Sequence, residues 1–107
     1  MSRAVRNGAL GQINNLDRMI HEPARLLICA LLYPLEEADF LYLPTQSALS
    51  KGNLSSHLAK LEEAGYANIE KRFKGKVPQA PCRLTVQGRQ AFENYRKSLK
   101  TLAKGLG

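Results

Sequence analysis

Apolar residues in the first third of the chain recur at the spacing of helices. Between residues 10 and 20 they follow at steps of three and four, which predicts a short helix with one apolar face: Leu10, Ile13, Leu16, Met19 and Ile20. Pro23 then predicts the start of a second helix, ending near Tyr33, because proline is tolerated in a first helical turn. Residues 26–32 are apolar on every face of this helix. Such a helix must be covered all round, and in so short a chain we expect a second subunit to cover it.

A short helix and a longer one are predicted between residues 40 and 65. Residues 40–43 form a brief extended segment that runs into the short helix, with Pro44 in its first turn. The longer helix covers about residues 50–64, with Ser50 as its N-cap and Gly65 as its C-terminal stop. One face of this helix is made of leucines and the outward face of small and polar residues: Leu54, Leu58 and Leu61 against Gly52, Asn53, Ser56, Ala59 and Lys60.

The pattern changes to alternation after Tyr66. This predicts a β-hairpin over about residues 67–85, with a basic tip at residues 74–76. Pro78 and Pro81 cannot donate hydrogen bonds to a ladder. The return strand is therefore expected at the edge of the sheet, or paired only near Arg83.

A last helix is predicted at about residues 86–104, with Thr85 as its N-cap. Its apolar residues step by three and four along one seam: Phe92, Tyr95, Leu99, Leu102 and Leu106. A seam of about two heptads is too short to be stable alone. It predicts a surface that needs a partner.

Composition narrows the class of protein. The 107 residues carry 16 Lys+Arg against 9 Asp+Glu, a net charge of +7, and 44% are apolar. We expect one small basic domain over residues 10–107, after a flexible N-terminus at residues 1–9. The charge is uneven: residues 1–63 hold 6 basic and 7 acidic residues, net −1, and residues 64–107 hold 10 and 2, net +8. No apolar run approaches the roughly 18–20 residues of a membrane span. A cytoplasmic location follows as the expectation, beside the nucleoid in a prokaryotic cell.

The order of these segments resembles the winged-helix transcriptional regulators of the MarR/ArsR type, in particular the compact stand-alone members. The likeness spans roughly residues 13–100 and is carried by four stretches: His-Glu-Pro-Ala-Arg-Leu at 21–26, Leu-Ser-Lys-Gly-Asn-Leu-Ser-Ser-His-Leu at 49–58, Lys-Leu-Glu-Glu-Ala-Gly-Tyr at 60–66 and Arg-Leu-Thr at 83–85. It implies a mostly α fold with a small β-hairpin, a winged helix-turn-helix, in which the N- and C-terminal helices form a dimer interface.

The chemistry of the predicted helix 50–64 agrees with this resemblance. A helix enters the major groove when its groove-facing side chains are short and can bond to base edges. Gly52, Asn53 and Ser56 meet this need, and Asn53 can pair with adenine through two hydrogen bonds. The side chains that flank this face are better placed to contact phosphates: Ser50, Lys51, Ser55 and Lys60. Phosphate contacts position a protein on DNA but do not read the base sequence.

The resemblance assigns the hairpin and the terminal helices further roles. The hairpin is expected to be the wing, which contacts the DNA backbone or minor groove through Arg72, Lys74 and Lys76, with Gly75 allowing the tight tip. The homodimer interface is expected to use nine apolar residues: Leu10, Ile13, Ile20, Leu27, Leu31, Phe92, Tyr95, Leu99 and Leu102. Leu41 departs from the family's pattern, because a polar cap often stands there.

These observations favour a sequence-specific regulator that binds double-stranded DNA, a homodimeric repressor reading a pseudo-palindromic operator. A winged-helix protein-interaction module in a larger assembly is the alternative, and it would carry large apolar groups on the outer face of residues 51–60. Single-stranded nucleic acid needs exposed aromatic rings for stacking, whereas Phe40, Tyr42 and Phe73 are expected to be buried. No catalytic dyad, nucleophile elbow or phosphate-binding loop appears, so neither an enzyme nor a cofactor is predicted.

Cysteine and histidine positions give no metal site. The close ligand pairs typical of zinc sites are missing among Cys29, Cys82, His21 and His57. Cys29 is expected to pack inertly, and His57 to pack with one hydrogen bond. Cys82 lies beside Arg83 in a strand expected to be more exposed, so it is the only candidate redox sensor. The resemblance also implies that an unknown small-molecule effector could bind between the dimer helices and the DNA-binding part. No residue in the sequence indicates such a pocket.

Overall fold

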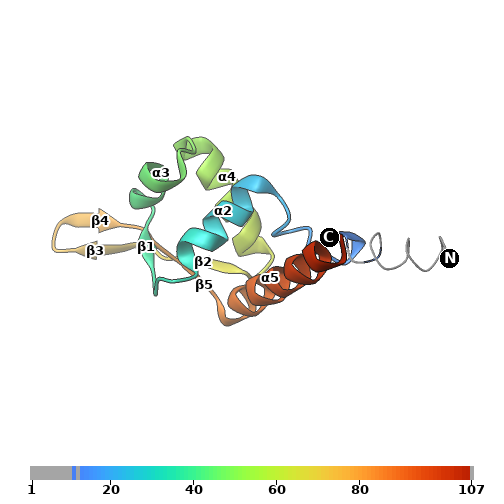
Figure 1. Ribbon diagram of the computed structural model, residues 1–107. Coiled ribbons are helices and arrows are strands. Elements are labelled where there is room, and N and C mark those ends of the chain that lie inside the picture. Colours follow the sequence, from blue (N-terminus) through green and yellow to red (C-terminus); the bar gives the residue numbers. More distant parts are fainter. Residues whose placement is uncertain (1–10, 12, 107) are drawn as a thin grey trace.

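The computed structural model describes residues 11 and 13–106. Between Pro23 and Leu106 the chain forms four helices and two small β-sheets, whose elements are labelled in Figure 1. In chain order they are α2 (Pro23–Leu32), β1 (Ala38–Asp39), α3 (Tyr42–Ser47), α4 (Lys51–Glu63), β2 (Ala67–Ile69), β3 (Arg72–Lys74), β4 (Val77–Gln79), β5 (Pro81–Leu84) and α5 (Val86–Leu106). The predicted fold class, mostly α with a small β part, is confirmed.

Helix α2 lies at the centre of the core. It packs against α3, α4 and β5, and Ile28, Cys29 and Leu32 are fully buried. The prediction that a second subunit covers this helix is therefore wrong for these three residues, because other elements of the same chain cover them. Leu27 stays 36% exposed and Leu31 is half-buried.

The predicted helix over residues 10–20 is corrected. Leu10 lies outside the described residues, Ile13 and Asn14 are helical, and the chain then turns from Asn15 onward. Asp17 explains the turn, because its carboxylate accepts the N–H groups of Met19 at 2.9 Å and Ile20 at 3.3 Å. These side-chain acceptors compete with the helical pattern.

The sheet differs from the prediction in one respect. Its strand order is β1-β5-β2, so the return strand β5 lies in the middle rather than at an edge. Pro81 is its first residue, a place where the missing N–H does least harm. Strand β1, only two residues long, supplies the second neighbour: Ala38 pairs with Cys82 and Asp39 with Pro81.

Helix α5 is docked on the sheet and on the end of α2. The hydroxyl oxygen of Thr85 accepts the N–H of Gly88 at 2.9 Å, which confirms the predicted N-cap. A methyl group at Gly88 would overlap the carbonyl oxygen of Tyr66, so the two backbones touch. Arg89 donates to the carbonyl oxygens of Tyr33 and Leu35, both at 2.6 Å, and so satisfies the end of α2.

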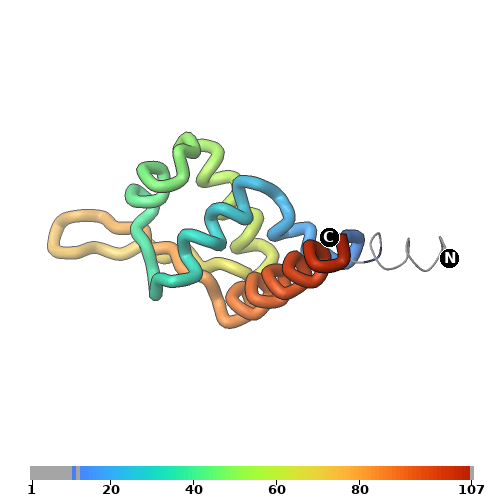
Figure 2. Tube along the Cα trace, in the orientation of Figure 1, coloured from blue at the N-terminus to red at the C-terminus, as the bar shows by residue number. Residues whose placement is uncertain are grey.

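Figures 1 and 2 show how these contacts orient the molecule. The β3–β4 hairpin projects from one end, beside α3 and the start of α4, and α5 runs toward the opposite end. In residues 11 and 13–106, no helix combines the length and the apolar character that spanning a membrane requires.

Candidate nucleic-acid interface

Helix α4 presents its predicted outward face to solvent. The Ser50 hydroxyl caps the helix by accepting the N–H of Asn53 at 3.1 Å. On the other side Leu54, Leu58 and Leu61 are fully buried, which fixes the rotation of α4 about its axis. Every predicted contact residue of this segment is consequently exposed: Ser50, Lys51, Gly52, Asn53, Ser55, Ser56 and Lys60.

The corner between α3 and α4 sets the angle at which α4 stands. Leu41 precedes α3 and makes no side-chain cap bond, but its own N–H donates to the Asp39 carboxylate at 2.9 Å. Pro44 lies in the first turn of α3, as predicted. The helix ends at Ala48, which adopts a left-handed conformation at φ 62° and ψ 14°.

His57 faces the start of α2 rather than the outward face of α4. Its Nδ1 lies 3.2 Å from a guanidinium nitrogen of Arg25, and its Nε2 lies 3.6 Å from the Glu22 carboxylate. Burial raises the pKa of Glu22, but the N–H of Arg25 and the nearby His57 outweigh it and hold the pKa below its usual value. His57 is thus a packing residue with a hydrogen bond, as predicted, and it fixes α4 against α2.

The wing is a tight two-residue hairpin. Gly75 and Lys76 join β3 to β4, and Lys74 pairs with Val77. Gly75 has φ +64°, a conformation that glycine adopts at no steric cost. The predicted wing residues Arg72, Lys74, Gly75 and Lys76 are all exposed.

Arg72 differs from the two lysines because carboxylates already hold its guanidinium. It donates to Glu37, and its other terminal nitrogen lies 3.8 Å from Glu70. Glu70 also accepts a hydrogen bond from Arg83 at 2.5 Å, and this bond keeps the pKa of the Glu70 carboxyl below its usual value. Arg72 therefore braces the base of the wing. Among the described residues, no ion pair involves Lys74 or Lys76.

Three exposed residues were left out of the site predicted from the sequence. Phe73 is 73% exposed and Tyr42 is 45% exposed, so the expected burial of these two rings is wrong, while Phe40 is half-buried. Lys71 is also exposed at the start of the hairpin. The β3–β4 pair forms a sheet of its own, and residues 72–78 are exposed. The alternating pattern in the sequence does not distinguish such an exposed sheet from one that packs on the core.

The two cysteines are both inside the molecule. Cys29 and Cys82 have no exposed surface, and burial raises the pKa of their thiols to about 12 and about 11. The candidate redox role of Cys82 is thereby corrected, because Cys82 lies in the core, where α2 packs against β5, and burial keeps its thiol protonated. Within residues 11 and 13–106, no three His, Cys, Asp or Glu side chains gather closely enough to hold a metal ion.

The residues predicted for a dimer interface divide into two groups. Ile20, Phe92 and Tyr95 are 0%, 6% and 3% exposed in the chain's own core, so their assignment to a subunit contact is corrected. Five keep exposed surface: Ile13, Leu27, Leu31, Leu99 and Leu102. Leu10 lies outside the described residues.

A hollow of about 790 Å³ separates the turn at residues 15–17 from α5. Polar groups of Asp17, Tyr66 and Tyr95 line it together with the outer face of α5. Tyr66 donates its hydroxyl to Asp17 at 2.5 Å, and His21 Nδ1 lies 2.7 Å from the Tyr95 hydroxyl. The hollow is large enough for a small molecule, although the sequence marks no such pocket.

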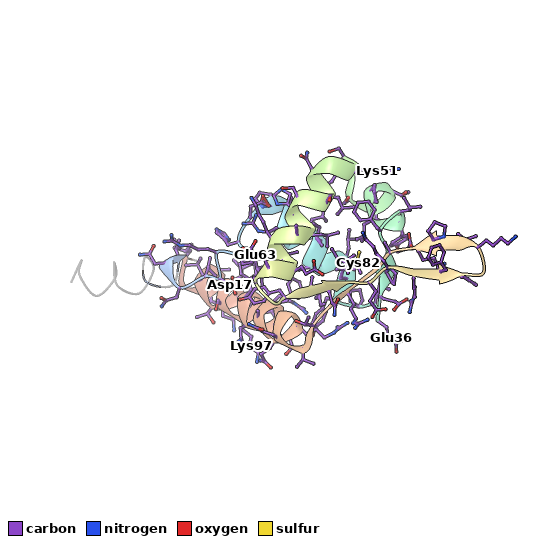
Figure 3. The ribbon with its side chains drawn as sticks, turned by 180° about the vertical axis from the view of Figure 1, so that it is seen from behind. Asp17, Glu36, Lys51, Glu63, Cys82 and Lys97 are labelled. Carbon is purple, nitrogen blue, oxygen red and sulfur yellow. The ribbon has the colours of Figure 1, made fainter. Side chains whose placement is uncertain are left out.

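The basic residues lie on more than one side of the molecule. Figure 3 shows Lys51, at the start of α4, on the edge opposite Glu36 and Lys97. Residues 67–85 hold five basic residues and one acidic, net +4, and residues 86–106 hold the same numbers. Half of the +8 therefore belongs to the hairpin region and half to α5, whose Lys97 lies away from the start of α4.

Comparison with known proteins gives concordant results. Residues 24–103 match the winged helix DNA-binding domain family. An uncharacterized protein of Methanocaldococcus jannaschii is 39% identical over 90 residues, which are 83% of this chain and 97% of that protein. The transcriptional regulator homologue of Pyrococcus horikoshii OT3 has a TM-score of 0.85 at 26% identity, over 90% of this chain and 97% of that chain. The transcriptional repressor CouR, bound to a 23-mer DNA duplex, has a TM-score of 0.70 at 18% identity, over 94% of this chain and 68% of that chain.

Proposed function

The chain belongs to the winged helix DNA-binding domain family, and we propose that it is a homodimeric repressor that reads a pseudo-palindromic operator in double-stranded DNA. The exposed face of α4 carries the proposal. Its side chains are short and polar at the end next to the wing, and three buried leucines prevent the helix from turning another face outward. Such a face suits close approach to base edges in the major groove.

Helix α4 and the wing are proposed to make different kinds of contact with DNA. Asn53 is proposed to pair with adenine, while Lys51 and Lys60 contact phosphates on either side of the groove. Lys74 and Lys76 are proposed to contact the backbone beyond the half-site. If each protomer engages about four phosphates, the log-log salt slope of a dimer is about −7.

The apolar face that a protein-docking winged helix would need is not on α4. Leu54, Leu58 and Leu61 are buried, and the exposed positions of α4 carry Gly, Asn, Ser, Ala and charged residues. This distribution favours DNA over a protein partner for α4. The CouR complex supplies a solved case in which a chain of this fold is bound to duplex DNA.

A mobility-shift titration tests the proposal. Duplexes enriched from a random pool are titrated with the protein at about 50 mM and about 200 mM salt. We expect an enriched palindrome and an affinity that falls by about 10⁴-fold between the two salt concentrations, as a slope of about −7 implies. Binding that is absent or insensitive to salt would overturn the proposal.

Two variants separate the proposed roles. Asn53→Ala is expected to weaken the enriched duplex more than a scrambled duplex, because it removes a base contact. Lys74→Ala combined with Lys76→Ala is expected to weaken both duplexes equally and to lower the salt slope by about 0.9 per lost contact. Equal losses on both duplexes for all variants would contradict this division.

A further inference from the structure

The wing carries apolar side chains that the core does not use. Phe73 is 73% exposed and Val77 is 61% exposed, and Phe73 packs neither in the core nor against it. Phe73 pairs across the hairpin with Pro78, and Val77 pairs with Lys74. Because successive side chains of a strand point to opposite faces, Phe73 and Pro78 share one face, and Val77 lies on the other.

The face with Phe73 borders a hollow. Phe73 and Pro78 line one side of a space of about 370 Å³, and Phe40 and Leu41, just before α3, line another. Leu41 is itself 62% exposed. The hollow therefore lies between the wing and the segment that leads into α3. Its wing side belongs to an element proposed to contact DNA.

The hairpin segment that carries this apolar face is basic in sequence. Residues 71–76 are Lys-Arg-Phe-Lys-Gly-Lys and contain no acid. Lys71 belongs to the wall of the hollow, together with Asp39 and Arg72, and the Arg72 guanidinium is already held by Glu37. Lys74 pairs with Val77 and so lies on the opposite face, while Lys76 lies at the tip. An apolar centre with a cationic border complements the DNA minor groove, where sugar and base edges form the walls and phosphates form the rims. An apolar protein segment would fill the hollow but would leave Lys71, which makes no ion pair among the described residues, without a partner.

We propose that Phe73, backed by Pro78 and Leu41, enters the minor groove next to the operator half-site and packs against sugar and base edges. The inference rests on the proposed DNA-binding function and adds a specific contact to it. Apolar wedges in the minor groove act most easily at flexible steps, because unstacking costs least there. Phe73 thus gives the protein a preference at base pairs that α4 does not touch.

Three variants test the wedge on the duplex enriched from a random pool. Phe73→Ala is expected to lower affinity about tenfold without changing the salt slope, since an apolar contact releases no counterions. Phe73→Leu is expected to retain most of the affinity. Val77→Ala removes a comparably exposed apolar side chain from the opposite face and is the matched control, with an affinity within about twofold of wild type. Circular dichroism of each variant checks that the fold is kept.

A second readout locates the contact in the minor groove. Replacing the adenines that flank the half-sites by diaminopurine adds an amino group to the minor groove and leaves the major groove unchanged. We expect this duplex to bind wild type more weakly and to bind Phe73→Ala no more weakly than the unmodified duplex does.

The outcomes are distinguishable. Salt-dependent binding by wild type, with Phe73→Ala within twofold of it, would overturn the wedge and leave the proposed function standing. A change confined to the oligomeric state of Phe73→Ala would also overturn it, because the face would then be a contact between copies. Failure of wild type to bind any duplex would overturn both proposals.

Discussion

Asp17 connects segments that lie far apart in the sequence. Its carboxylate accepts two N–H groups of the turn before α2 and the hydroxyl of Tyr66, which follows α4. The hydrogen bond to Asp17, together with burial, raises the pKa of Tyr66 to about 12. Asp17 and Tyr66 therefore hold the end of α4 against the N-terminal turn.

This pair predicts a pH dependence for Tyr66→Phe. The folded pKa lies above the usual value of about 10, so the neutral phenol stabilises the fold. Its contribution is complete below about pH 10 and is lost as the pH rises to about 12. Urea unfolding is expected to give wild type about 1 kcal/mol more stability than Tyr66→Phe at pH 8, and a smaller difference near pH 11.

Tyr42→Phe is the control for that experiment, because Tyr42 is an exposed tyrosine. The substitution is expected to leave the free energy of unfolding at pH 8 unchanged. A Tyr66→Phe difference that stays constant from about pH 9 to about pH 12 would contradict the role of the hydrogen bond.

Ala48 gives a second prediction at the scale of one residue. Its left-handed backbone, at φ 62°, costs an L-residue roughly 1–2 kcal/mol. Ala48→Gly is therefore expected to raise the free energy of unfolding by about 0.5–1 kcal/mol, after the larger backbone entropy of glycine is subtracted. Ala59→Gly, on the exposed face of α4, should lower it by about 1 kcal/mol. Similar losses in both variants would show that Ala48 is not strained.

At the scale of elements, the close contact between α5 and Tyr66 offers a direct test of how the helix is docked. Gly88 admits no side chain, because the Tyr66 carbonyl occupies the place of a Cβ. Gly88→Ala must displace α5 from β2 and is expected to cost at least about 3 kcal/mol in thermal or urea unfolding. Gly52→Ala is the matched control, since nothing lies within 4 Å of its Cβ position. A Gly88→Ala loss below about 1 kcal/mol would contradict the close approach.

Helices and strands could be predicted where the sequence signals that define them lie within the same segment. Helix α4 was expected from Ser50 to Gly65 because a cap, a leucine face and a stop all lie within one segment, and it spans Lys51–Glu63. Strand β5 was misplaced because its partner β1 is two residues long and far away in the sequence. The periodicity of the sequence cannot predict such a pairing, because the neighbours of a strand depend on tertiary packing.

At the scale of the whole molecule, α5 changes from a core helix to an uncovered one along its length. Phe92 and Tyr95 are buried, Leu99 and Leu102 are half-buried, and Leu106 is 66% exposed. The apolar seam thus continues beyond the core that covers its first half. A second copy of the chain is the proposed cover, in keeping with the seam's heptad spacing.

Leu102→Glu tests that dimer. A charge on the seam is expected to shift the protein toward monomer in sedimentation equilibrium, because an ionised carboxylate is costly to bury. Thr101→Glu makes the same change of net charge at the adjacent exposed position and is expected to leave the oligomeric state unchanged. A dimer that persists in Leu102→Glu would remove this half of α5 from the interface.

The sequence by itself determined the order of the helices α2 to α5, the exposed polar face of α4, the basic hairpin and the uneven charge, because caps, turns and periodicities act within a few residues. Tertiary structure alone decided three other features. The chain's own elements cover one side of α2, α2 packs against β5 and Cys82 lies in the core, and Phe73 stays 73% exposed. Burial depends on what packs against a side chain, and the packing partners of these residues come from distant parts of the chain.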